Sequence, residues 1–201
     1  MPVILLVCTA NICRSPLAAG LLDAALRPQH DSSLQVLSAG TTAVEGAPIC
    51  PTSMHQLRAR HGEPLVADAS RRGRLTVDLL DEADLVLTAD RHQRSFIAQL
   101  SPAARSRTFT LREAAYLASA WPAPAAEAAE LTDLVQALNG LRGRVPLPGS
   151  GRRGLLTSRR TGIDIHDGHA ASPRHHAETL QEVSAATEAL AAFLRKAAAV
   201  A

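Results

Sequence analysis

Apolar residues along the chain fall into two kinds of stretch, short unbroken runs and longer runs at helical spacing. The short runs are bounded by turn residues and cover 2–8, 34–39, 83–88 and 107–111. Runs of this kind predict strands of a parallel sheet, because helices cover both faces of such a strand. Four buried strands are therefore expected.

Apolar residues three or four positions apart predict helices between and after these strands. The expected helices cover 16–26, 51–60, 75–80, 90–100, 113–119, 125–141 and 173–199. A strand, helix and strand that follow one another in one sheet should be parallel, with a right-handed connection. The pattern therefore predicts an α/β sandwich with helices on both faces of the sheet.

The pattern changes in the region of residues 121–162. Two prolines, Pro122 and Pro124, precede the expected helix at 125–141, and residues 140–162 are rich in Gly, Pro and Arg. The weak periodicity of that last segment predicts a mobile, solvated basic loop. We therefore expect an inserted helix and loop at about 121–162 within a single domain that spans 1–201.

Composition and charge narrow the class of protein. The 201 residues are 46% hydrophobic and 20% charged, as is usual for a globular domain with a sizeable core. A net charge of +2 gives no nucleic-acid signature. Three cysteines are too few for a secreted disulfide framework, and no apolar stretch is long enough for a signal peptide or a membrane span. We expect a cytoplasmic protein with neither a nucleic-acid nor a membrane partner.

The first strand leads directly into the most informative stretch of the chain. Cys8 ends the strand, where open α/β sheets bind ligands, and a helix is expected to start near Ser15 and Pro16, with the serine as its N-cap. Loop N–H groups and the helix dipole then point at an anion above Cys8 and favour its thiolate, the nucleophilic form. Arg14 would clamp two oxygens of that anion. The stretch therefore predicts a phosphate cradle with a nucleophile in its floor.

Each residue of this loop has an expected task. Phosphate oxygens would be held by the backbone of Thr9, Ala10, Asn11, Ile12, Cys13 and Arg14. Asn11 can adopt the left-handed conformation of a tight loop, and the hydroxyl of Ser15 can donate to the thiolate of Cys8. A Walker A loop is excluded, because the chain lacks GxxxxGK at this point.

Residues 7–16, VCTANICRSP, resemble the signature V/I-C-x-G-N-x-C-R-S-P of the low-molecular-weight protein tyrosine phosphatases. Ala10 stands where that family usually has glycine. Residues 38–41, SAGT, are similar to the family's sequence after its second strand. The resemblance covers roughly residues 1–118 and 163–195.

The resemblance implies a fold and an activity. The fold would be a three-layer α/β sandwich with a four-stranded parallel sheet in the order 2-1-3-4. The activity would be hydrolysis of phosphotyrosine in proteins or peptides through a cysteinyl-phosphate intermediate, without metal or organic cofactor. A monomer or weak dimer is expected.

The resemblance also implies roles for individual residues. Cys8 would be the nucleophile, Arg14 the phosphate-binding arginine and Ser15 the partner of the thiolate. Asn11 and Ser38 would support the loop. Cys13 matches the family's second loop cysteine, which can form a reversible disulfide with the nucleophile and protect it from over-oxidation.

The general acid is the least regular part of the resemblance. The family carries it in a D-P-Y/F motif shortly before the last helix, and an ungapped comparison places this motif on Asp167, Gly168 and His169, in preference to Asp164. Glycine should loosen a loop that proline would restrict, and histidine offers a weaker stacking surface for a phenyl ring. We therefore predict Asp167 as the acid, with slower or less tyrosine-selective turnover than in a typical member.

Four histidines, His166, His169, His175 and His176, raise the question of a metal site. No cysteine is near them in the sequence, and a surface cluster beside a helix start is the commoner arrangement. We therefore predict no metal site. Cys50, which precedes a proline, is expected to be a small core or loop residue.

Three other functions share parts of this pattern. Arsenate reductases have the same loop but use further cysteines in a later segment, and none follows Cys50 here. Protein arginine phosphatases tend to carry threonine where Ile12 stands, and a bulky isoleucine favours a flat aryl phosphate. A phosphate-binding regulator with weak turnover is the third alternative, because the acid motif departs from the family pattern.

Overall fold

The computed structural model describes residues 1–27, 34–61, 70–121, 130–148 and 162–198. Its described strands form one parallel sheet in the order β3-β2-β1-β4-β5. The strands are β1 (Val3–Cys8), β2 (Gln35–Gly40), β3 (Arg71–Arg74), β4 (Leu85–Thr88) and β5 (Thr108–Thr110). The predicted α/β class with a parallel sheet is therefore confirmed.

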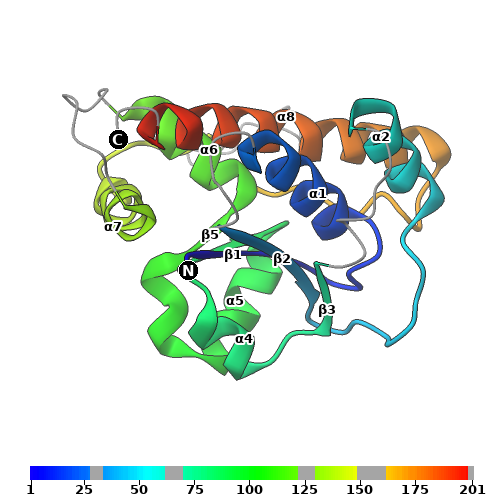
Figure 1. Ribbon diagram of the computed structural model, residues 1–201, viewed down its shortest axis with the longest axis horizontal. Coiled ribbons are helices and arrows are strands. Elements are labelled where there is room, and N and C mark those ends of the chain that lie inside the picture. Colours follow the sequence, from blue (N-terminus) through cyan, green and yellow to red (C-terminus); the bar gives the residue numbers. More distant parts are fainter. Residues whose placement is uncertain (28–33, 62–69, 122–129, 149–161, 199–201) are drawn as a thin grey trace, which may run out of the picture.

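Helices cover both faces of this sheet (Figure 1). They are α1 (Arg14–Leu26), α2 (Pro51–His61), α4 (Val77–Glu82), α5 (Arg91–Leu100), α6 (Leu111–Ala120), α7 (Leu131–Leu141) and α8 (Pro173–Ala198), with a 3-10 helix η2 (Pro102–Arg107). Helices α1, α2, α6 and α8 lie above the sheet in Figure 1, and α4 and α5 lie below it. The described part of the chain contains no helix that is long and apolar enough to cross a membrane.

Alternation along β1 divides the core into two layers. Ile4 and Leu6 belong to the larger cluster, which contains the apolar faces of α1, α6 and α8. Leu5 and Val7 belong to the smaller cluster with Ile97 of α5. Because successive side chains of a strand point to opposite faces, the unbroken apolar run of β1 is buried on both sides.

The prediction of four strands is wrong, because β3 is a fifth strand at the sheet edge. Its sequence, RRGR, has no apolar alternation, and its residues alternate between half-buried and exposed. Backbone pairing holds it, since the Ser38 N–H donates to the Ser70 carbonyl at 3.0 Å and the Leu75 N–H to the Gly40 carbonyl at 2.8 Å. Charged residues are typical of edge strands, and they hide such a strand from a search for hydrophobic runs.

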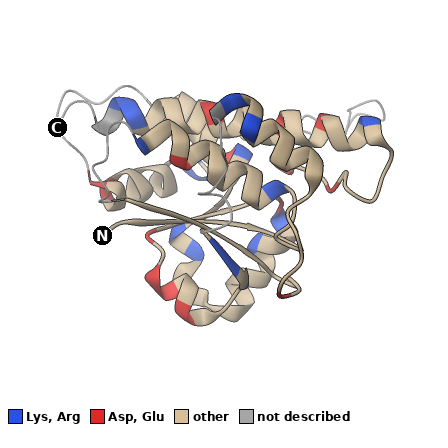
Figure 2. Ribbon diagram, turned by 45° about the vertical axis from the view of Figure 1, so that its right-hand side comes forward, with Lys and Arg blue, Asp and Glu red and all other residues tan. Residues whose placement is uncertain are grey.

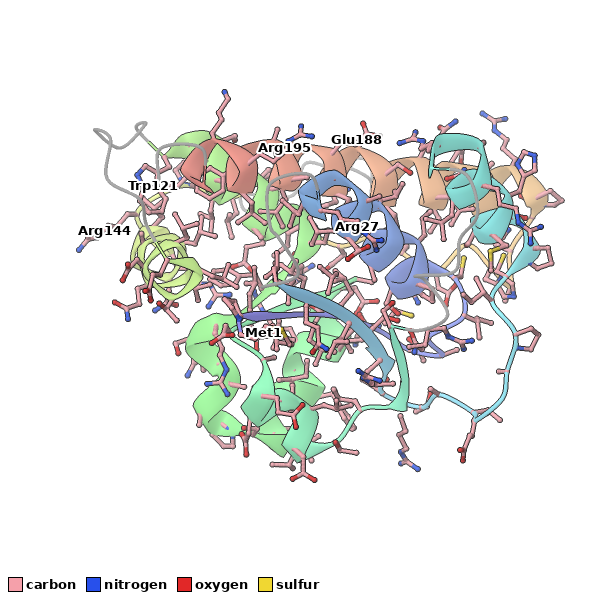
Figure 3. All side chains as sticks on the ribbon, viewed as in Figure 1. Met1, Arg27, Trp121, Arg144, Glu188 and Arg195 are labelled. Carbon is pink, nitrogen blue, oxygen red and sulfur yellow. The ribbon has the colours of Figure 1, made fainter. Side chains whose placement is uncertain are left out.

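Within the insertion, the structure describes α7 and residues 142–148. Arg142, directly after α7, lies over the Phe109 ring at 3.9 Å and donates to the buried Glu113 carboxylate at 3.1 Å. Trp121, which Figure 3 labels, packs its ring against Phe193 of α8, and the ring centroids are 5.7 Å apart. The N-terminal end of the expected helix, 125–129, and most of the expected loop, 149–161, lie outside the described residues.

Basic and acidic residues are interspersed over the helices (Figure 2).

Candidate active site

The segment from the end of β1 to the first turn of α1, residues 8–15, is here called the phosphate loop. Cys8 is almost completely buried at the end of β1. The loop turns back on its sulfur, because Asn11 has the left-handed backbone conformation, with φ of 54°. Cys8 Sγ accepts one hydrogen bond from the Asn11 N–H, at 3.3 Å, and another from the Ser15 hydroxyl, at 3.0 Å. Two donors therefore face the predicted nucleophile.

Helix α1 begins at Arg14, two residues earlier than expected, so that Ser15 does not cap it. Cys13 holds the N-cap position, but its side chain makes no capping hydrogen bond to the helix. The Ser15 hydroxyl is 3.0 Å from Cys8 Sγ and 2.9 Å from Asn11 Oδ1, and its single proton serves one acceptor at a time. The side chain is therefore turned into the site rather than toward the helix end.

Strand β2 supports the phosphate loop from the side. Asn11 Nδ2 donates to the Ser38 backbone carbonyl at 3.2 Å. The Ser38 hydroxyl is buried and has no hydrogen-bond partner among the described residues, so Ser38 contacts the loop through its backbone. A side chain at Gly40 would come within 2.6 Å of the Thr9 carbonyl and 2.9 Å of the Asn11 nitrogen. Glycine is therefore required where the loop crosses β2.

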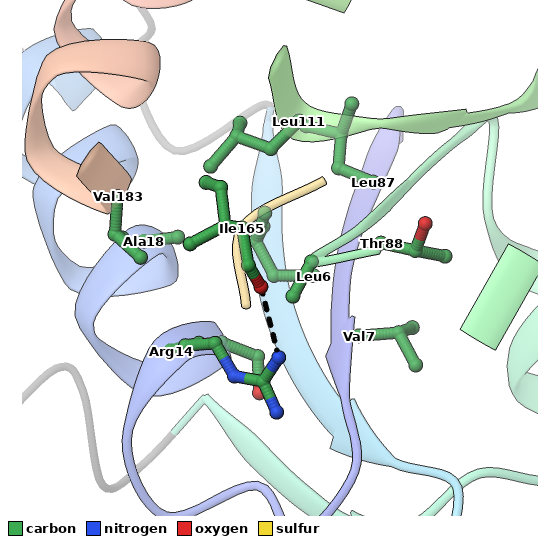
Figure 4. A pocket seen from close by; sticks show the side chains of 11 residues that line it. Leu6, Val7, Arg14, Ala18, Leu87, Thr88, Leu111, Ile165 and Val183 are labelled. Atoms are coloured by element: carbon green, nitrogen blue, oxygen red, sulfur yellow. Dashed lines mark hydrogen bonds between the residues drawn. The ribbon is translucent and has the colours of Figure 1, made fainter. Parts of the chain in front are cut away.

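Arg14 follows the turn of the loop, and its guanidinium makes three hydrogen bonds to other parts of the chain. Nη1 donates to the Ile165 carbonyl at 3.0 Å, the contact drawn in Figure 4, and to Asp90 Oδ2 at 3.3 Å. Nη2 donates to Asp167 Oδ2 at 2.7 Å. Only 3% of the Arg14 side chain is exposed, and apolar residues such as Leu111 and Val183 line the space behind it. Burial among apolar groups strengthens these charge-assisted contacts.

Two residues of the site escaped the sequence analysis, Asp90 and Gln93. Asp90 caps α5 by accepting from the His92 and Gln93 N–H groups, and its second oxygen accepts from Arg14. Gln93 Nε2 donates to Asp90 Oδ2 at 2.9 Å and to Thr9 Oγ1 at 3.1 Å. The capping box was a readable signal for the start of a helix, but nothing in it indicates a contact with Arg14.

Residues 162–172, here called the acid loop, bring the predicted acid to the phosphate loop. Asp167 is half-exposed, and its second oxygen accepts from the His169 N–H at 2.9 Å. Asp164 instead forms an ion pair with Arg91 at 2.7 Å. Burial acts to raise the pKa of the Asp164 carboxyl, but the hydrogen bonds and charge of Arg91 outweigh it and hold this pKa below its usual range. Of the two candidate acids, only Asp167 contacts Arg14.

Gly168, which is expected to loosen the acid loop, also has a packing role. The residue is buried, and a Cβ there would lie 2.6 Å from the His175 carbonyl oxygen and would also clash with Thr179 Oγ1. The Thr179 hydroxyl donates to the His166 carbonyl at 3.2 Å. Glycine therefore lets the acid loop lie directly against α8.

The predicted redox residue, Cys13, lies next to residues that the sequence separates widely. Its sulfur is 3.1 Å from Nε2 of His176, and the Cys50 sulfur is 3.5 Å from the same nitrogen. The ring of His169 meets that of His176 edge-on at 5.1 Å. The sequence places no cysteine near these histidines, but the fold brings Cys13 and Cys50 beside His176. His175 contacts Ser172 instead.

Burial changes the acid–base properties of this group. It raises the pKa of the Cys13 thiol to about 12, aided by Cys50 and opposed by the hydrogen bond from Ser53. It also lowers the pKa of His176, aided by the charge of His169 and opposed by Asp167. Burial therefore favours the neutral thiol of Cys13 over its thiolate.

Comparison with known proteins identifies the family. The family model for low molecular weight phosphotyrosine protein phosphatase matches residues 3–122. A probable low molecular weight protein-tyrosine-phosphatase from Ralstonia nicotianae is 37% identical over 110 residues, which cover 55% of this chain and 70% of the relative. A protein-arginine-phosphatase from Geobacillus stearothermophilus is 36% identical over 110 residues, which cover 55% and 69% of the two chains.

Solved structures share the fold at lower sequence identity. An arginine phosphatase from Geobacillus stearothermophilus gives a TM-score of 0.62 at 23% identity, covering 98% of this chain and 94% of the other. A tyrosine phosphatase from Erwinia amylovora gives 0.59 at 19% identity, covering 94% and 90%. Because the family model spans more than half of the sequence, this chain belongs to the family of low molecular weight phosphotyrosine protein phosphatases.

Proposed function

We propose that this phosphatase hydrolyses phosphotyrosine in proteins or peptides through a cysteinyl-phosphate intermediate on Cys8. The observation that carries the proposal is that Asp167 meets the loop of Cys8 and Arg14, although it lies 153 positions after Arg14. Arg14 leaves the loop that surrounds Cys8 and donates to Asp167 at 2.7 Å. The proposal assigns Cys8, Arg14 and Asp167 the roles of nucleophile, anion-binding guanidinium and proton donor, which phosphate-ester cleavage requires.

Binding would use the backbone of the phosphate loop and the guanidinium of Arg14. The N–H groups of residues 9–14 would surround three phosphate oxygens. Nη1 of Arg14 is fixed by a backbone carbonyl and by Asp90, whereas Nη2 contacts only Asp167 among the hydrogen bonds described. An entering phosphate dianion would therefore compete with Asp167 for Nη2, which frees the carboxyl group to face the leaving oxygen.

Cleavage would proceed in two steps. The Cys8 thiolate attacks phosphorus, the bond from phosphorus to the tyrosine oxygen breaks, and protonated Asp167 gives its proton to that oxygen. Water then attacks the cysteinyl phosphate while the Asp167 carboxylate takes a proton from it. The sulfur–phosphorus bond breaks and inorganic phosphate leaves. The N–H of Asn11 and the hydroxyl of Ser15 both stabilise the departing thiolate.

Wider properties of the protein stay predictions. These are a cytoplasmic location, a monomer or weak dimer, and the absence of nucleic-acid and membrane partners. The reversible disulfide between Cys8 and Cys13 also stays a prediction, taken from the family resemblance. The cleavage chemistry itself calls for no metal or organic cofactor.

Leaving-group dependence tests the acid. Turnover of a series of aryl phosphates would be measured for the wild type and for Asp167→Asn, with Asp164→Asn as the matched control. We expect Asp167→Asn to lower kcat about 10²–10³-fold for poor leaving groups and little for good ones. An unchanged rate for poor leaving groups would reject Asp167.

The choice between enzyme and phosphate-binding regulator needs a separate measurement. Steady-state hydrolysis of an aryl phosphate would be compared with binding of inorganic phosphate, with Cys8→Ser as the inactive control. Hydrolysis that disappears in Cys8→Ser supports the proposal. Intact phosphate binding without any wild-type hydrolysis would favour the regulator.

Arginine phosphatase activity is the second candidate, because a curated relative of that activity is 36% identical. Ile12 is half-buried on the loop. Protein arginine phosphatases tend to have threonine at this position, and the bulkier isoleucine favours a flat aryl phosphate over a branched guanidinium phosphate. We expect phosphotyrosine peptides to give the higher kcat/KM, and Ile12→Thr to shift the ratio toward phosphoarginine. A preference for phosphoarginine in the wild type would overturn the tyrosine assignment.

An arsenate reductase is disfavoured by the lack of cysteines after Cys50.

A further inference from the structure

Beside the phosphate loop, two cysteines and two histidines gather from four separate segments. Cys13, Cys50, His169 and His176 each have one potential ligand atom, and all four atoms lie within 4.8 Å of one another. Two thiolates and two imidazoles are a usual ligand set of a tetrahedral zinc site. We propose that these four residues bind one Zn²⁺ ion.

The spacing of the ligand atoms fits this proposal. With Zn–S bonds of about 2.3 Å and Zn–N bonds of about 2.0–2.1 Å, neighbouring ligand atoms of a tetrahedron lie about 3.3–3.8 Å apart. His176 Nε2 is 3.1 Å from Cys13 Sγ and 3.5 Å from Cys50 Sγ. The widest pair in the cluster must therefore approach by only about 1 Å, which side-chain rotation can provide.

The backbone around the cluster is held in place by contacts that do not involve the ligand atoms. The Cys50 N–H donates to the Ile12 carbonyl at 2.7 Å, which joins the start of α2 to the phosphate loop. The His176 N–H donates to the Ser172 carbonyl at 3.0 Å in the first turn of α8. Gly168 brings the acid loop against α8. The four positions are thus brought together by the fold itself.

Accessibility differs between the two halves of the cluster. Cys13 and Cys50 are each only 4% exposed, whereas His176 is half-exposed and His169 is exposed. Zinc can therefore enter from the histidine side and reach sulfurs that are shielded from bulk oxidants. The Ser53 hydroxyl, 3.4 Å from Cys13 Sγ, can donate to that sulfur, as outer hydrogen bonds do around metal ligands.

The donor atoms select the kind of metal. Thiolate and imidazole favour zinc over magnesium or calcium, which prefer oxygen ligands. Binding releases the two thiol protons to solvent, and two thiolates then balance the charge of Zn²⁺. The site would therefore add no net charge beside the phosphate loop, and the anion would still be held by Arg14 and the loop N–H groups.

Zinc at this position would connect the two loops of the active site. His169 follows Asp167 by two residues, and its N–H already donates to Asp167 Oδ1 at 2.9 Å. A zinc ion shared by His169 and Cys13 would tether the acid loop to the phosphate loop. It would also occupy the Cys13 sulfur, so that Cys13 could not form a disulfide with Cys8 while zinc is bound.

Cobalt substitution tests the site without any turnover, so its outcome does not depend on the proposed function. Reduced protein carrying Cys8→Ser, which removes the nucleophile as a competing ligand, would be titrated with Co²⁺ and then with Zn²⁺. We expect one Co²⁺ per chain, a sulfur-to-cobalt charge-transfer band in the near ultraviolet and intense visible bands of tetrahedral coordination. Zn²⁺ should abolish both. Binding without the charge-transfer band would overturn the proposal.

Variants locate the metal. In the same background, His176→Ala and Cys50→Ala should each weaken Zn²⁺ binding by at least about 100-fold, measured by competition with a chromophoric chelator. His175→Ala, one position before His176, is the matched control and should bind Zn²⁺ as tightly as the parent. Equal affinities of His175→Ala and His176→Ala would exclude this site.

Loss of folding is separated from loss of the metal by circular dichroism of the metal-free proteins. Cys50 is buried, so its variant carries the greater risk, whereas His176 is half-exposed and its replacement should fold normally. His176→Ala therefore decides the question if Cys50→Ala does not fold. A folded His176→Ala variant that still binds Zn²⁺ as tightly as the parent would refute the proposal.

Discussion

The phosphate loop and the acid loop meet at Arg14 but are held in different ways. The phosphate loop is held chiefly by its own residues and the adjacent strand β2, through bonds such as Asn11 N–H to Cys8 Sγ and Asn11 Nδ2 to the Ser38 carbonyl. The acid loop is held by parts of the chain that lie far away in sequence. The Ile165 N–H, for example, donates to the Ala89 carbonyl at 2.9 Å.

This difference separates anion binding from proton transfer. The phosphate loop is a contiguous strand, loop and helix, so its geometry follows from neighbouring residues. The acid loop is positioned by Arg91, by Thr110, whose hydroxyl donates to the Ile163 carbonyl at 2.7 Å, and by α8 against Gly168. Substitutions that displace the phosphate loop or Arg14 should therefore impair turnover of every substrate, whereas those that displace Asp167 should act according to the leaving group.

The largest effect is expected for Arg14→Lys. Lysine keeps the charge but cannot replace the two-pronged guanidinium, which here contacts a carbonyl and two carboxylates. We predict that kcat/KM falls on the order of 10³-fold for aryl phosphates of any leaving group. The measurement is steady-state turnover across a leaving-group series. A loss confined to poor leaving groups would contradict the assignment of Arg14 to phosphate binding.

Gly40→Ala should have the next largest effect. The new methyl group would meet backbone atoms of Thr9 and Asn11, which cannot rotate away, so the phosphate loop must shift. We expect kcat/KM to fall about 10²-fold, since a displacement near 1 Å at a reacting group costs that much. Gly140→Ala is the control, because a Cβ there meets nothing within 4 Å. Equal activity of the two variants would argue against a tight crossing at Gly40.

The phosphate loop was predictable from sequence because its signal is local. A buried strand ending in Cys8, an asparagine suited to the left-handed conformation and an arginine at the helix start are all within a few residues of one another. The parallel sheet was predictable from its apolar runs for the same reason. The edge strand β3 was not, because backbone pairing with β2 rather than a buried apolar face defines it.

The rest of the site depends on contacts between residues far apart in the chain, which no local sequence pattern predicts. Asp90 reads as a helix cap, and only the packing of α5 beside the phosphate loop places it against Arg14. Cys50 reads as a small core residue, yet it lies 3.5 Å from His176, 126 positions away. Gly168 reads as a residue that loosens its loop. Its close contact with α8 is not visible in the sequence, because it depends on where the last helix lies.

Gly168→Ala tests whether the acid loop contributes to proton transfer but not to anion binding. The added methyl group would push the acid loop off α8 and displace Asp167, while the phosphate loop stays intact. We predict that kcat falls about 10-fold for poor leaving groups and is nearly unchanged for good ones, because only the former need a proton. The same leaving-group series measures it. A uniform fall for all substrates would show that the acid loop also supports anion binding.

Asp164→Asn should produce the smallest effect and act on stability rather than on turnover. Arg91 is largely exposed and the carboxylate largely buried, so losing this ion pair should cost about 1–2 kcal/mol of unfolding free energy at neutral pH. Because the folded pKa of Asp164 is lowered, its carboxylate contributes fully above the ordinary carboxyl pKa of about 4, and the contribution is lost as the pH falls through the folded pKa.

Urea denaturation of the wild type and of Asp164→Asn from pH 7 down to pH 3 measures this contribution. The stability difference should be constant above about pH 5 and should shrink as the medium becomes more acidic. Turnover of aryl phosphates at neutral pH should match the wild type within a few-fold. A stability difference that grows toward low pH would show that Asp164 is not held as a carboxylate by Arg91. A large loss of turnover for poor leaving groups would make Asp164, rather than Asp167, the acid.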